Sequence, residues 1–128
     1  MAAFRILVID DSDVILAKVK SALTAEGYEV TTTTQAVGNA RHIPNVDLVI
    51  IDFHMPGIDG GTVVQSLRQA AGDNHPALFY LYSSDASLRP EDHAFDGVIS
   101  EKGDDEALVR QVRAIVRIVQ LKALRPKK

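Results

Sequence analysis

Two short apolar runs, each followed by aspartate, constrain the fold of this chain more than any other feature. Residues 5–9 run into Asp10 and Asp11, and residues 47–51 run into Asp52. Short runs rich in isoleucine and valine are typical of strands buried on both faces of a parallel sheet. The carboxyl ends of such strands meet at one edge of the sheet, where ligands bind. If the two strands are neighbours, the three aspartates converge on one pocket.

Three converging carboxylates favour a metal site. At about 5 Å, two carboxylates repel each other by roughly 3 kcal/mol at an effective dielectric constant of ~20. Such a cluster persists only if a cation occupies it or protons neutralise it. Mg²⁺ prefers carboxylates, water and phosphate oxygens, so it is the cation that best fits Asp10, Asp11 and Asp52.

The rest of the sequence alternates strand-like and helix-like patterns. Strands are expected at residues 4–9, 28–32, 46–51, 78–82 and 98–100. Helices are expected from residue 13 to about Gly27, at 61–71 and at 104–124, with weaker helical stretches at 35–41 and 84–93. This alternation predicts an α/β fold, with a doubly wound five-stranded parallel sheet and helices on both faces.

Composition excludes several classes of protein. The 128 residues suffice for one domain, and the net charge of −3 argues against a nucleic-acid-binding body. The absence of cysteine excludes disulfides and thiolate zinc sites. No apolar stretch approaches the roughly 18 residues of a membrane span. Arg5, Asp10 and Asp11 interrupt any signal-peptide pattern, so a cytoplasmic location is expected.

Each candidate residue also has an ordinary structural interpretation. Asp10 and Asp11 suit the cap of the following helix, and Asp52 suits a turn. Lys102 suits a solvated surface, and Ser83 suits a cap of the next segment. Their combination favours a functional site, because all of them follow strands that end at the same edge of the sheet.

The longest motif begins at Asp52 and reads Asp-Phe-His-Met-Pro-Gly-Ile-Asp-Gly over residues 52–60. It stands beside Val8-Ile9-Asp10-Asp11, Ser83-Ser84 and Lys102. With these residues the sequence resembles the receiver domain of two-component response regulators, including the stand-alone chemotaxis type. The resemblance covers residues 1–124, with 125–128 as a basic tail, and implies the flavodoxin-like strand order 2-1-3-4-5.

This resemblance also implies a chemistry. Asp52 would accept a phosphoryl group from a phosphohistidine on a histidine kinase or histidine phosphotransfer protein. Ser83 and Lys102 would neutralise and report the phosphoryl charge, with no enzymatic turnover beyond self-phosphorylation and self-dephosphorylation of Asp52. The implied ligands of Mg²⁺ are the carboxylates of Asp10, Asp11 and Asp52 and the backbone carbonyl of His54.

The sequence departs from the family pattern around Lys102. The family usually has proline after this lysine, but Gly103 stands here, and Glu101 is an extra residue before it. A cis bond is therefore not expected, and the loop must place the ammonium in another way. Val98 and Ile99 stand where the family offers an aromatic switch residue, so aromatic rotamer coupling is not expected.

Two further features concern lifetime and partners. By the resemblance, His54, two residues after Asp52, and Asp85, two residues after Ser83, flank the approach of water to the phosphoryl group. Asp85 is expected to orient a hydrolytic water; the alternatives are that it repels the phosphoryl group or that both side chains are simply solvated. On the last helix, an arginine-rimmed strip with apolar residues suits docking of a downstream protein, and the alternative is a solvated basic stripe. The strip consists of Arg113, Arg117, Ile118 and Leu121.

Two other functions remain open at this point. One is a receiver-like interaction module that is not regulated by phosphorylation. The other is a haloacid-dehalogenase-like phosphatase, because Asp11-Ser12-Asp13 after a strand fits its Asp-x-Asp start. The phosphatase alternative leaves Asp52 and the Met55-Pro56-Gly57 stretch unexplained. The sequence fits both a stand-alone regulator and one domain of a longer protein.

Overall fold

The computed structural model describes residues 3–35, 38–72, 77–93 and 95–123. Its main sheet has five strands: β1 (Arg5–Ile9), β2 (Glu29–Thr33), β3 (Leu48–Asp52), β6 (Leu78–Tyr82) and β7 (Gly97–Ile99). The α-helices are α1 (Asp13–Ala25), α2 (Gly60–Ala71) and α3 (Asp105–Ala123). Shorter elements are the 3₁₀ helices η1 (Ala40–Asn45) and η2 (Pro90–His93) and the strands β4 (His54–Met55) and β5 (Ile58–Asp59).

The strand order of the main sheet is β2-β1-β3-β6-β7, and each pairing in it is parallel. Counting these five strands along the chain gives the order 2-1-3-4-5, so the predicted doubly wound topology is confirmed. The chain leaves β1 towards β2 and returns on the other side of β1 as β3. This reversal places a crevice at the carboxyl ends of β1 and β3.

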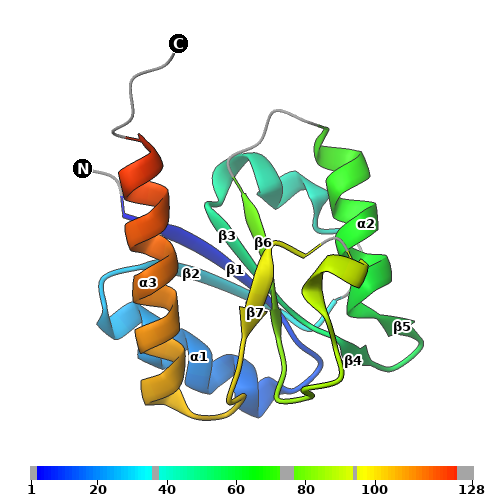
Figure 1. Cartoon of the computed structure of the whole chain (residues 1–128), viewed down its shortest axis with the longest axis horizontal. Helices are drawn as coiled ribbons and strands as arrows, with labels where there is room; N and C mark the ends of the chain where they lie inside the picture. The colour runs from blue at the N-terminus through cyan, green and yellow to red at the C-terminus, as the bar shows by residue number, and fades with distance from the viewer. Residues whose placement is uncertain (1–2, 36–37, 73–76, 94, 124–128) are drawn as a thin grey trace.

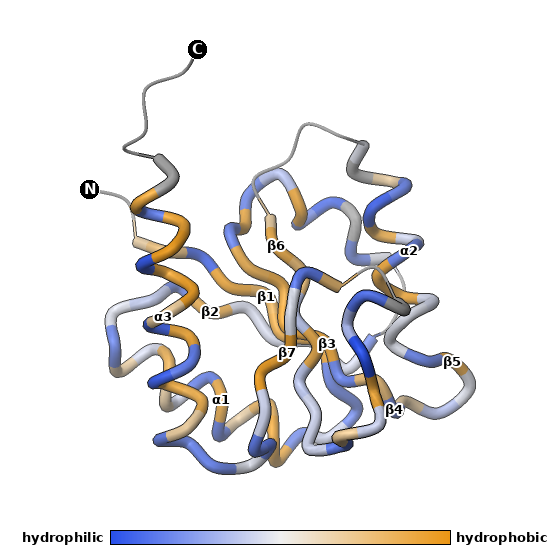
Figure 2. Tube along the Cα trace, viewed as in Figure 1, coloured by the Kyte–Doolittle hydropathy of each residue, from blue (hydrophilic) through white to orange (hydrophobic). Residues whose placement is uncertain are grey.

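Helices cover both faces of the sheet, with α1 and α3 on one side and α2 on the other (Figure 1). Alternate residues of each strand point to opposite faces. In β1, Ile6 and Val8 belong to the core shared with α1 and α3, whereas Leu7 and Ile9 belong to the core shared with α2. The central strands are therefore apolar along their length, while the helices alternate between polar and apolar residues (Figure 2).

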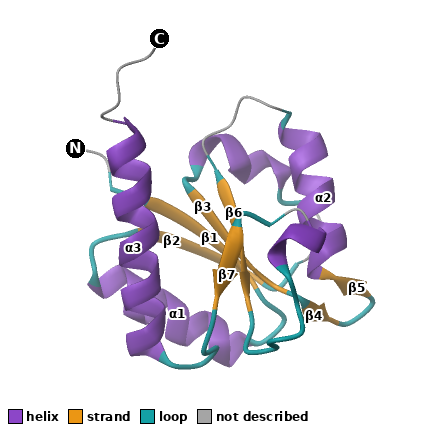
Figure 3. Cartoon of the chain, viewed as in Figure 1, coloured by secondary structure: helices purple, strands orange, loops and turns teal. Residues whose placement is uncertain are grey.

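Polar caps start each α-helix near the same sheet edge. The Ser12 side chain accepts a hydrogen bond from the backbone N–H of Ile15, and the Asp59 side chain accepts one from Thr62. At the start of α3, Asp104 Oδ1 accepts from the N–H of Ala107 at 3.0 Å. These caps satisfy backbone donors that have no partner within the helix. The loops that leave the carboxyl ends of the strands lead into these helices (Figure 3).

Several local predictions need correction. Of the short helix expected at residues 35–41, residues 36–37 lie outside the described residues, and residues 40–41 belong to a 3₁₀ helix, Ala40–Asn45, in which Pro44 lacks the amide that an α-helix needs. The stretch between the strand expected at 46–51 and the helix expected at 61–71 contains the antiparallel pair β4 and β5, which was not expected. The fifth strand ends at Ile99 rather than Ser100, whose N–H bonds the side chain of Gln111. The predicted tail at 125–128 lies outside the described residues.

In the described part of the chain, none of the helices combines the length and the apolar composition that crossing a bilayer requires.

Candidate functional site

Three carboxylates meet at the crevice between β1 and β3. Asp52 is the last residue of β3, and Asp10 and Asp11 directly follow β1. One carboxylate oxygen from each of the three lies within 4.8 Å of the others. Asp10 and Asp52 are only 1% and 5% exposed, whereas Asp11 is open to solvent. The structure thus brings together the acidic residues that the sequence singled out.

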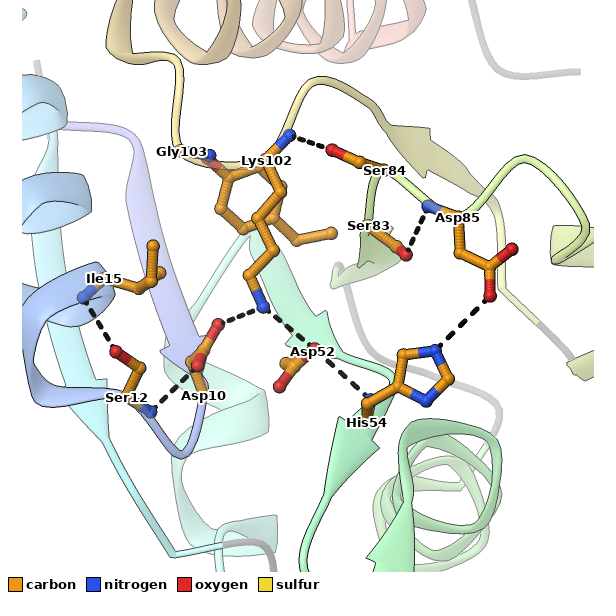
Figure 4. Close-up of polar contacts among 11 residues, drawn as sticks. Asp10, Ser12, Ile15, Asp52, His54, Ser83, Ser84, Asp85, Lys102 and Gly103 are labelled. Atoms are coloured by element: carbon orange, nitrogen blue, oxygen red, sulfur yellow. Dashed lines mark hydrogen bonds and ion pairs between the residues drawn. The ribbon is translucent and has the colours of Figure 1, made fainter.

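Lys102 extends from the loop after β7 into this acidic cluster, between Asp10 and Asp52 (Figure 4). Its Nζ lies 2.7 Å from Asp10 Oδ2 and 2.9 Å from Asp52 Oδ1. Asp10 Oδ2 is buried and accepts no hydrogen bond of good geometry from the described residues, so the lysine acts as its countercharge. The ammonium therefore reaches the carboxylates although glycine, not proline, follows Lys102.

Burial and neighbouring charges set the protonation behaviour of this cluster. Burial raises the pKa of Asp52, and the Asp10 charge adds to that effect, while Lys102 and the N–H of His54 oppose it. Burial alone would lower the pKa of Lys102, but its contacts with Asp10 and Asp52 outweigh burial and raise it. Lys102 therefore stays cationic, whereas ionised Asp52 carries a desolvation cost.

Ser83 and His54 border the cluster and connect it to Asp85. The Ser83 side chain is 7% exposed, and its Oγ accepts a hydrogen bond from the N–H of Asp85 at 3.0 Å. His54 donates its N–H to Asp52 Oδ1 at 3.3 Å, and its Nε2 lies 3.5 Å from Asp85 Oδ2 (Figure 4). Hydrogen bonds from Ser87, and secondarily His54, lower the pKa of Asp85.

These residues line an open cleft of about 570 Å³ at the carboxyl end of the sheet. Its lining includes Asp10, Asp11, Asp52, His54, Ser83, Ser84, Asp85 and Lys102. A hollow of similar size, about 610 Å³, is lined by residues of α3 and by Glu26, which directly follows α1. We assign function to the first cleft because it contains the buried charges.

Sequence reasoning missed the residues that hold the Lys102 loop. The N–H of Lys102 donates to Ser84 Oγ at 2.8 Å, and the N–H of Gly103 donates to the Tyr82 hydroxyl at 3.0 Å. On the other side, Lys18 Nζ donates to the carbonyl oxygen of Gly103 at 2.8 Å. Their place in the sequence could have indicated this role. Because β6 pairs with β7, hydroxyl groups at or just after the end of β6 lie beside the loop that follows β7.

A family model described as the response regulator receiver domain matches residues 6–113. The chain belongs to this family. It is 30% identical to the response regulator PleD of Caulobacter vibrioides over 120 residues, which cover 88% of this chain and 26% of that protein. It is 32% identical to the transcriptional regulatory protein PrrA of Mycobacterium leprae, covering 94% of this chain and 49% of PrrA. The receiver thus spans about a quarter to a half of these relatives.

Solved structures agree with this assignment. The response regulator TrrA of Thermotoga maritima, crystallised in complex with Mg²⁺ and BeF, is 30% identical with a TM-score of 0.71. That match covers 87% of this chain and 97% of TrrA. A CheY-like receiver domain protein from Methanospirillum hungatei has a TM-score of 0.78 at 22% identity, covering 94% of this chain and 99% of that one. This second likeness supports the fold alone.

Membership in the family makes this chain a receiver domain of two-component response regulators, a class of signalling domains rather than enzymes. The phosphatase alternative finds no support in the acidic cluster. Among the described residues, the group of acidic side chains that could hold a metal is Asp10, Asp11 and Asp52. Asp13, which that alternative pairs with Asp11, begins α1 and lies outside the group.

The donor set of the receiver's cleft fits a hard divalent cation. Three carboxylates against one ammonium leave an excess of two negative charges when all groups are ionised. Oxygen ligands of this kind are preferred by Mg²⁺, which also retains water and binds phosphate oxygens. Among the described residues, Lys102 is the countercharge of the buried Asp10 Oδ2, and a second cation in the cleft would add to the neutralisation of Asp10.

Proposed function

We propose that Asp52 is the phosphoryl acceptor of this receiver. A carboxylate oxygen of Asp52 bonds to phosphorus while the bond between phosphorus and a partner's imidazole nitrogen breaks, and that nitrogen keeps the electron pair. The observation that carries the proposal is the buried Asp52 carboxylate at the floor of the cleft, which shares the Lys102 ammonium with Asp10. Carboxylates form acyl phosphates by this kind of nucleophilic attack.

We propose that Asp10, Asp11 and Asp52 hold Mg²⁺, with the backbone carbonyl of His54 as a further ligand. Bound there, the metal supplies positive charge to the phosphoryl oxygens. Phosphoryl transfer depends chiefly on positioning and on neutralisation of these oxygens. The backbone N–H of His54 donates a hydrogen bond to Asp52 Oδ1 and so orients the carboxylate that accepts the phosphoryl group.

Lys102 and Ser83 have complementary roles in this proposal. Lys102 neutralises the carboxylates before transfer, and its ammonium then pairs with an oxygen of the phosphoryl group. The Ser83 hydroxyl, which borders the cleft, donates a hydrogen bond to a second oxygen. Both contacts differ between the free and phosphorylated states, and this difference is what allows phosphorylation to shift the receiver between conformations.

The proposed partners are a protein that carries phosphohistidine and a downstream protein target. For the target we propose docking on α3, where Ile118 and Leu121 are 48% and 58% exposed and Arg117 is exposed beside them. Arg113 forms an ion pair with Glu26, which directly follows α1, so it is a less clean probe of docking than Ile118. Ile118→Glu should weaken target binding at least about tenfold, whereas Gln120→Glu, also exposed on α3, should not.

Intact mass spectrometry tests the phosphoryl-acceptor assignment. Incubation of the whole chain with acetyl phosphate and Mg²⁺ should give a single phosphoryl adduct. Asp52→Ala should abolish the adduct, and Asp13→Ala, a control at a nearby exposed carboxylate, should retain it. Equal labelling of the Asp52 variant would overturn the assignment. A chain that never forms the adduct would instead be an interaction module that phosphorylation does not regulate.

A further inference from the structure

We propose that the hydroxyl groups of Tyr82 and Ser84 are positioning groups that hold Lys102 over Asp52. The inference rests on the proposed phosphoryl-acceptor function, and it assigns to two residues of β6 and the adjoining loop a role that acts through the lysine. Among the hydrogen bonds of the described residues, neither hydroxyl bonds to Asp10, Asp11 or Asp52. Both instead accept hydrogen bonds from the backbone that carries Lys102.

Two consecutive amides of the loop are held in this way. The N–H of Lys102 donates to Ser84 Oγ at 2.8 Å, and the next N–H, of Gly103, donates to Tyr82 Oη at 3.0 Å. The carbonyl oxygen of Gly103 accepts from Lys18 Nζ of α1 at 2.8 Å. The loop is therefore tied to the sheet through its N–H groups and to α1 through a carbonyl.

Tyr82 is a fixed support. Its side chain is 1% exposed and packs in the core shared with α1 and α3, so its hydroxyl has little freedom to move. The Lys102 ammonium lies 5.6 Å from the centre of the Tyr82 ring, within the range of a cation–π contact. One buried side chain thus contacts both the backbone after Lys102 and the charged end of Lys102 itself.

The loop needs such support because its backbone is otherwise free to choose among conformations. Gly103 adopts a φ of +96°, and Glu101 adopts a φ of +58°, which is uncommon for a residue with a side chain. Lys102 lies between these two residues and must bring its Nζ within 2.7 Å and 2.9 Å of two separate carboxylates. A small shift of this backbone would break both contacts.

Tyr82→Phe is the sharpest test, because it removes the hydroxyl and keeps the buried ring. Tyr80→Phe is the matched control, since Tyr80 lies two residues earlier on the same face of β6 and packs against the same core. With acetyl phosphate and Mg²⁺, we expect Tyr82→Phe to slow phosphorylation of Asp52 about fivefold, the usual worth of one hydrogen bond. The control should match the parent, and Ser84→Ala should act in the same direction as Tyr82→Phe.

A second readout does not depend on phosphorylation. In metal-free protein labelled with ¹⁵N-lysine, the ion-paired Lys102 ammonium should give a resolved NMR signal because it exchanges slowly with water. Tyr82→Phe should broaden or shift this signal, and Tyr80→Phe should leave it unchanged. A merely structural role of Tyr82 would lower thermal stability without moving the signal.

The two readouts separate the possible failures. An unchanged ammonium signal in Tyr82→Phe and Ser84→Ala would overturn the positioning role, and so would a changed signal with an unchanged phosphorylation rate. If Tyr82→Phe does not fold, the exposed Ser84→Ala decides by the same two measurements. If the parent is never phosphorylated on Asp52, the acceptor proposal fails, while the NMR signal still reports whether the hydroxyls hold Lys102.

Discussion

The two halves of the receiver's cleft differ in how they hold charge. At its floor, Asp10, Asp52 and Lys102 are largely buried. The Lys102 Nζ lies 2.7 Å from Asp10 Oδ2 and 2.9 Å from Asp52 Oδ1. At its rim, His54 and Asp85 face each other at 3.5 Å with 65% and 39% of their side chains exposed. Contacts between a basic side chain and a carboxylate therefore occur in two very different environments.

This difference indicates separate tasks for the two halves. Water screens the contact between His54 and Asp85, so this contact contributes little to stability. The two side chains can instead influence how a hydrolytic water approaches Asp52. The floor charges are poorly solvated, and each therefore depends strongly on its partners. We expect changes at the floor to alter folding and metal binding strongly, and changes at the rim to alter mainly rates, with only small effects on stability.

The largest effect is expected from Lys102→Ala. It leaves Asp10 and Asp52 buried without their countercharge, which should lower the free energy of unfolding by about 3 kcal/mol at neutral pH. The loss should shrink in acid, where Asp52 takes up a proton, and in Mg²⁺, which binds the folded state. Urea unfolding measures both dependences. Lys20→Ala, at an exposed position of α1, should change stability by less than about 0.5 kcal/mol.

Asp11→Ala should have the next largest effect, on metal affinity rather than on folding. Asp11 is the exposed member of the acidic group, so its removal leaves the core intact and relieves repulsion in the metal-free protein. We expect Mg²⁺ affinity, measured by titration calorimetry, to fall at least about tenfold, with the melting temperature unchanged or raised. An affinity equal to the parent's would exclude Asp11 as a ligand.

The pH dependence of stability should have opposite signs at the floor and the rim. The pKa of Asp52 is raised above its usual 3.8 by burial, so its stabilising contribution is complete below pH 3.8 and is lost as pH rises through the raised pKa. Asp52→Asn should therefore gain stability relative to the metal-free parent as pH rises through this range. Denaturant midpoints recorded across acidic pH measure this difference.

Asp85→Asn provides the contrast. The pKa of Asp85 is lowered below 3.8, chiefly by hydrogen bonds from Ser87, so its contribution is present above pH 3.8 and is lost as pH falls through the lowered pKa. The variant should lose stability relative to the parent as pH rises, by less than Asp52→Asn gains, because Asp85 is exposed. The same sign in both variants would contradict the distinction between floor and rim.

The smallest effect is expected on the lifetime of the phosphorylated receiver. If Asp85 orients a hydrolytic water, Asp85→Ala should slow dephosphorylation severalfold and leave Mg²⁺ affinity unchanged. Loss of the adduct after removal of acetyl phosphate, followed by intact mass, measures the rate. Ser87→Ala is a useful companion, because it removes the hydrogen bond from the Ser87 hydroxyl to Asp85 Oδ1 and keeps the carboxylate. If Asp85→Ala loses the phosphoryl group as fast as the parent or faster, Asp85 does not orient the hydrolytic water.

The sheet and the acidic cluster were predictable because both follow from short-range patterns. Residues 6–9 and 48–51 are buried apolar runs, and the aspartates that follow them come together once parallel pairing is assumed. The support for Lys102 was not predictable in this way. Tyr82 and Ser84 contact the loop across 21 and 18 residues of sequence, and their role depends on β6 lying beside β7.

Local geometry after Asp52 was also beyond pattern reasoning. A side chain at Gly60 would lie 2.6 Å from the backbone oxygen of Asp52, and the N–H of Gly60 bonds the Phe53 oxygen at 2.8 Å. This close return of the chain forms the β4–β5 hairpin, which composition alone presents only as a turn. At residues 40–41, the weak helix propensity of the stretch 35–41 gives way to η1, which contains Pro44.

Chemical mapping of the phosphoryl group tests the central claim most directly. The parent, phosphorylated with acetyl phosphate and Mg²⁺, is reduced with borohydride, which converts an aspartyl phosphate into homoserine, and its peptides are then sequenced by mass spectrometry. We predict homoserine at position 52, with Asp10 and Asp11 unchanged. Homoserine at position 10 or 11, or a borohydride-resistant phosphoryl group on His54, would contradict the assignment of Asp52 as the acceptor.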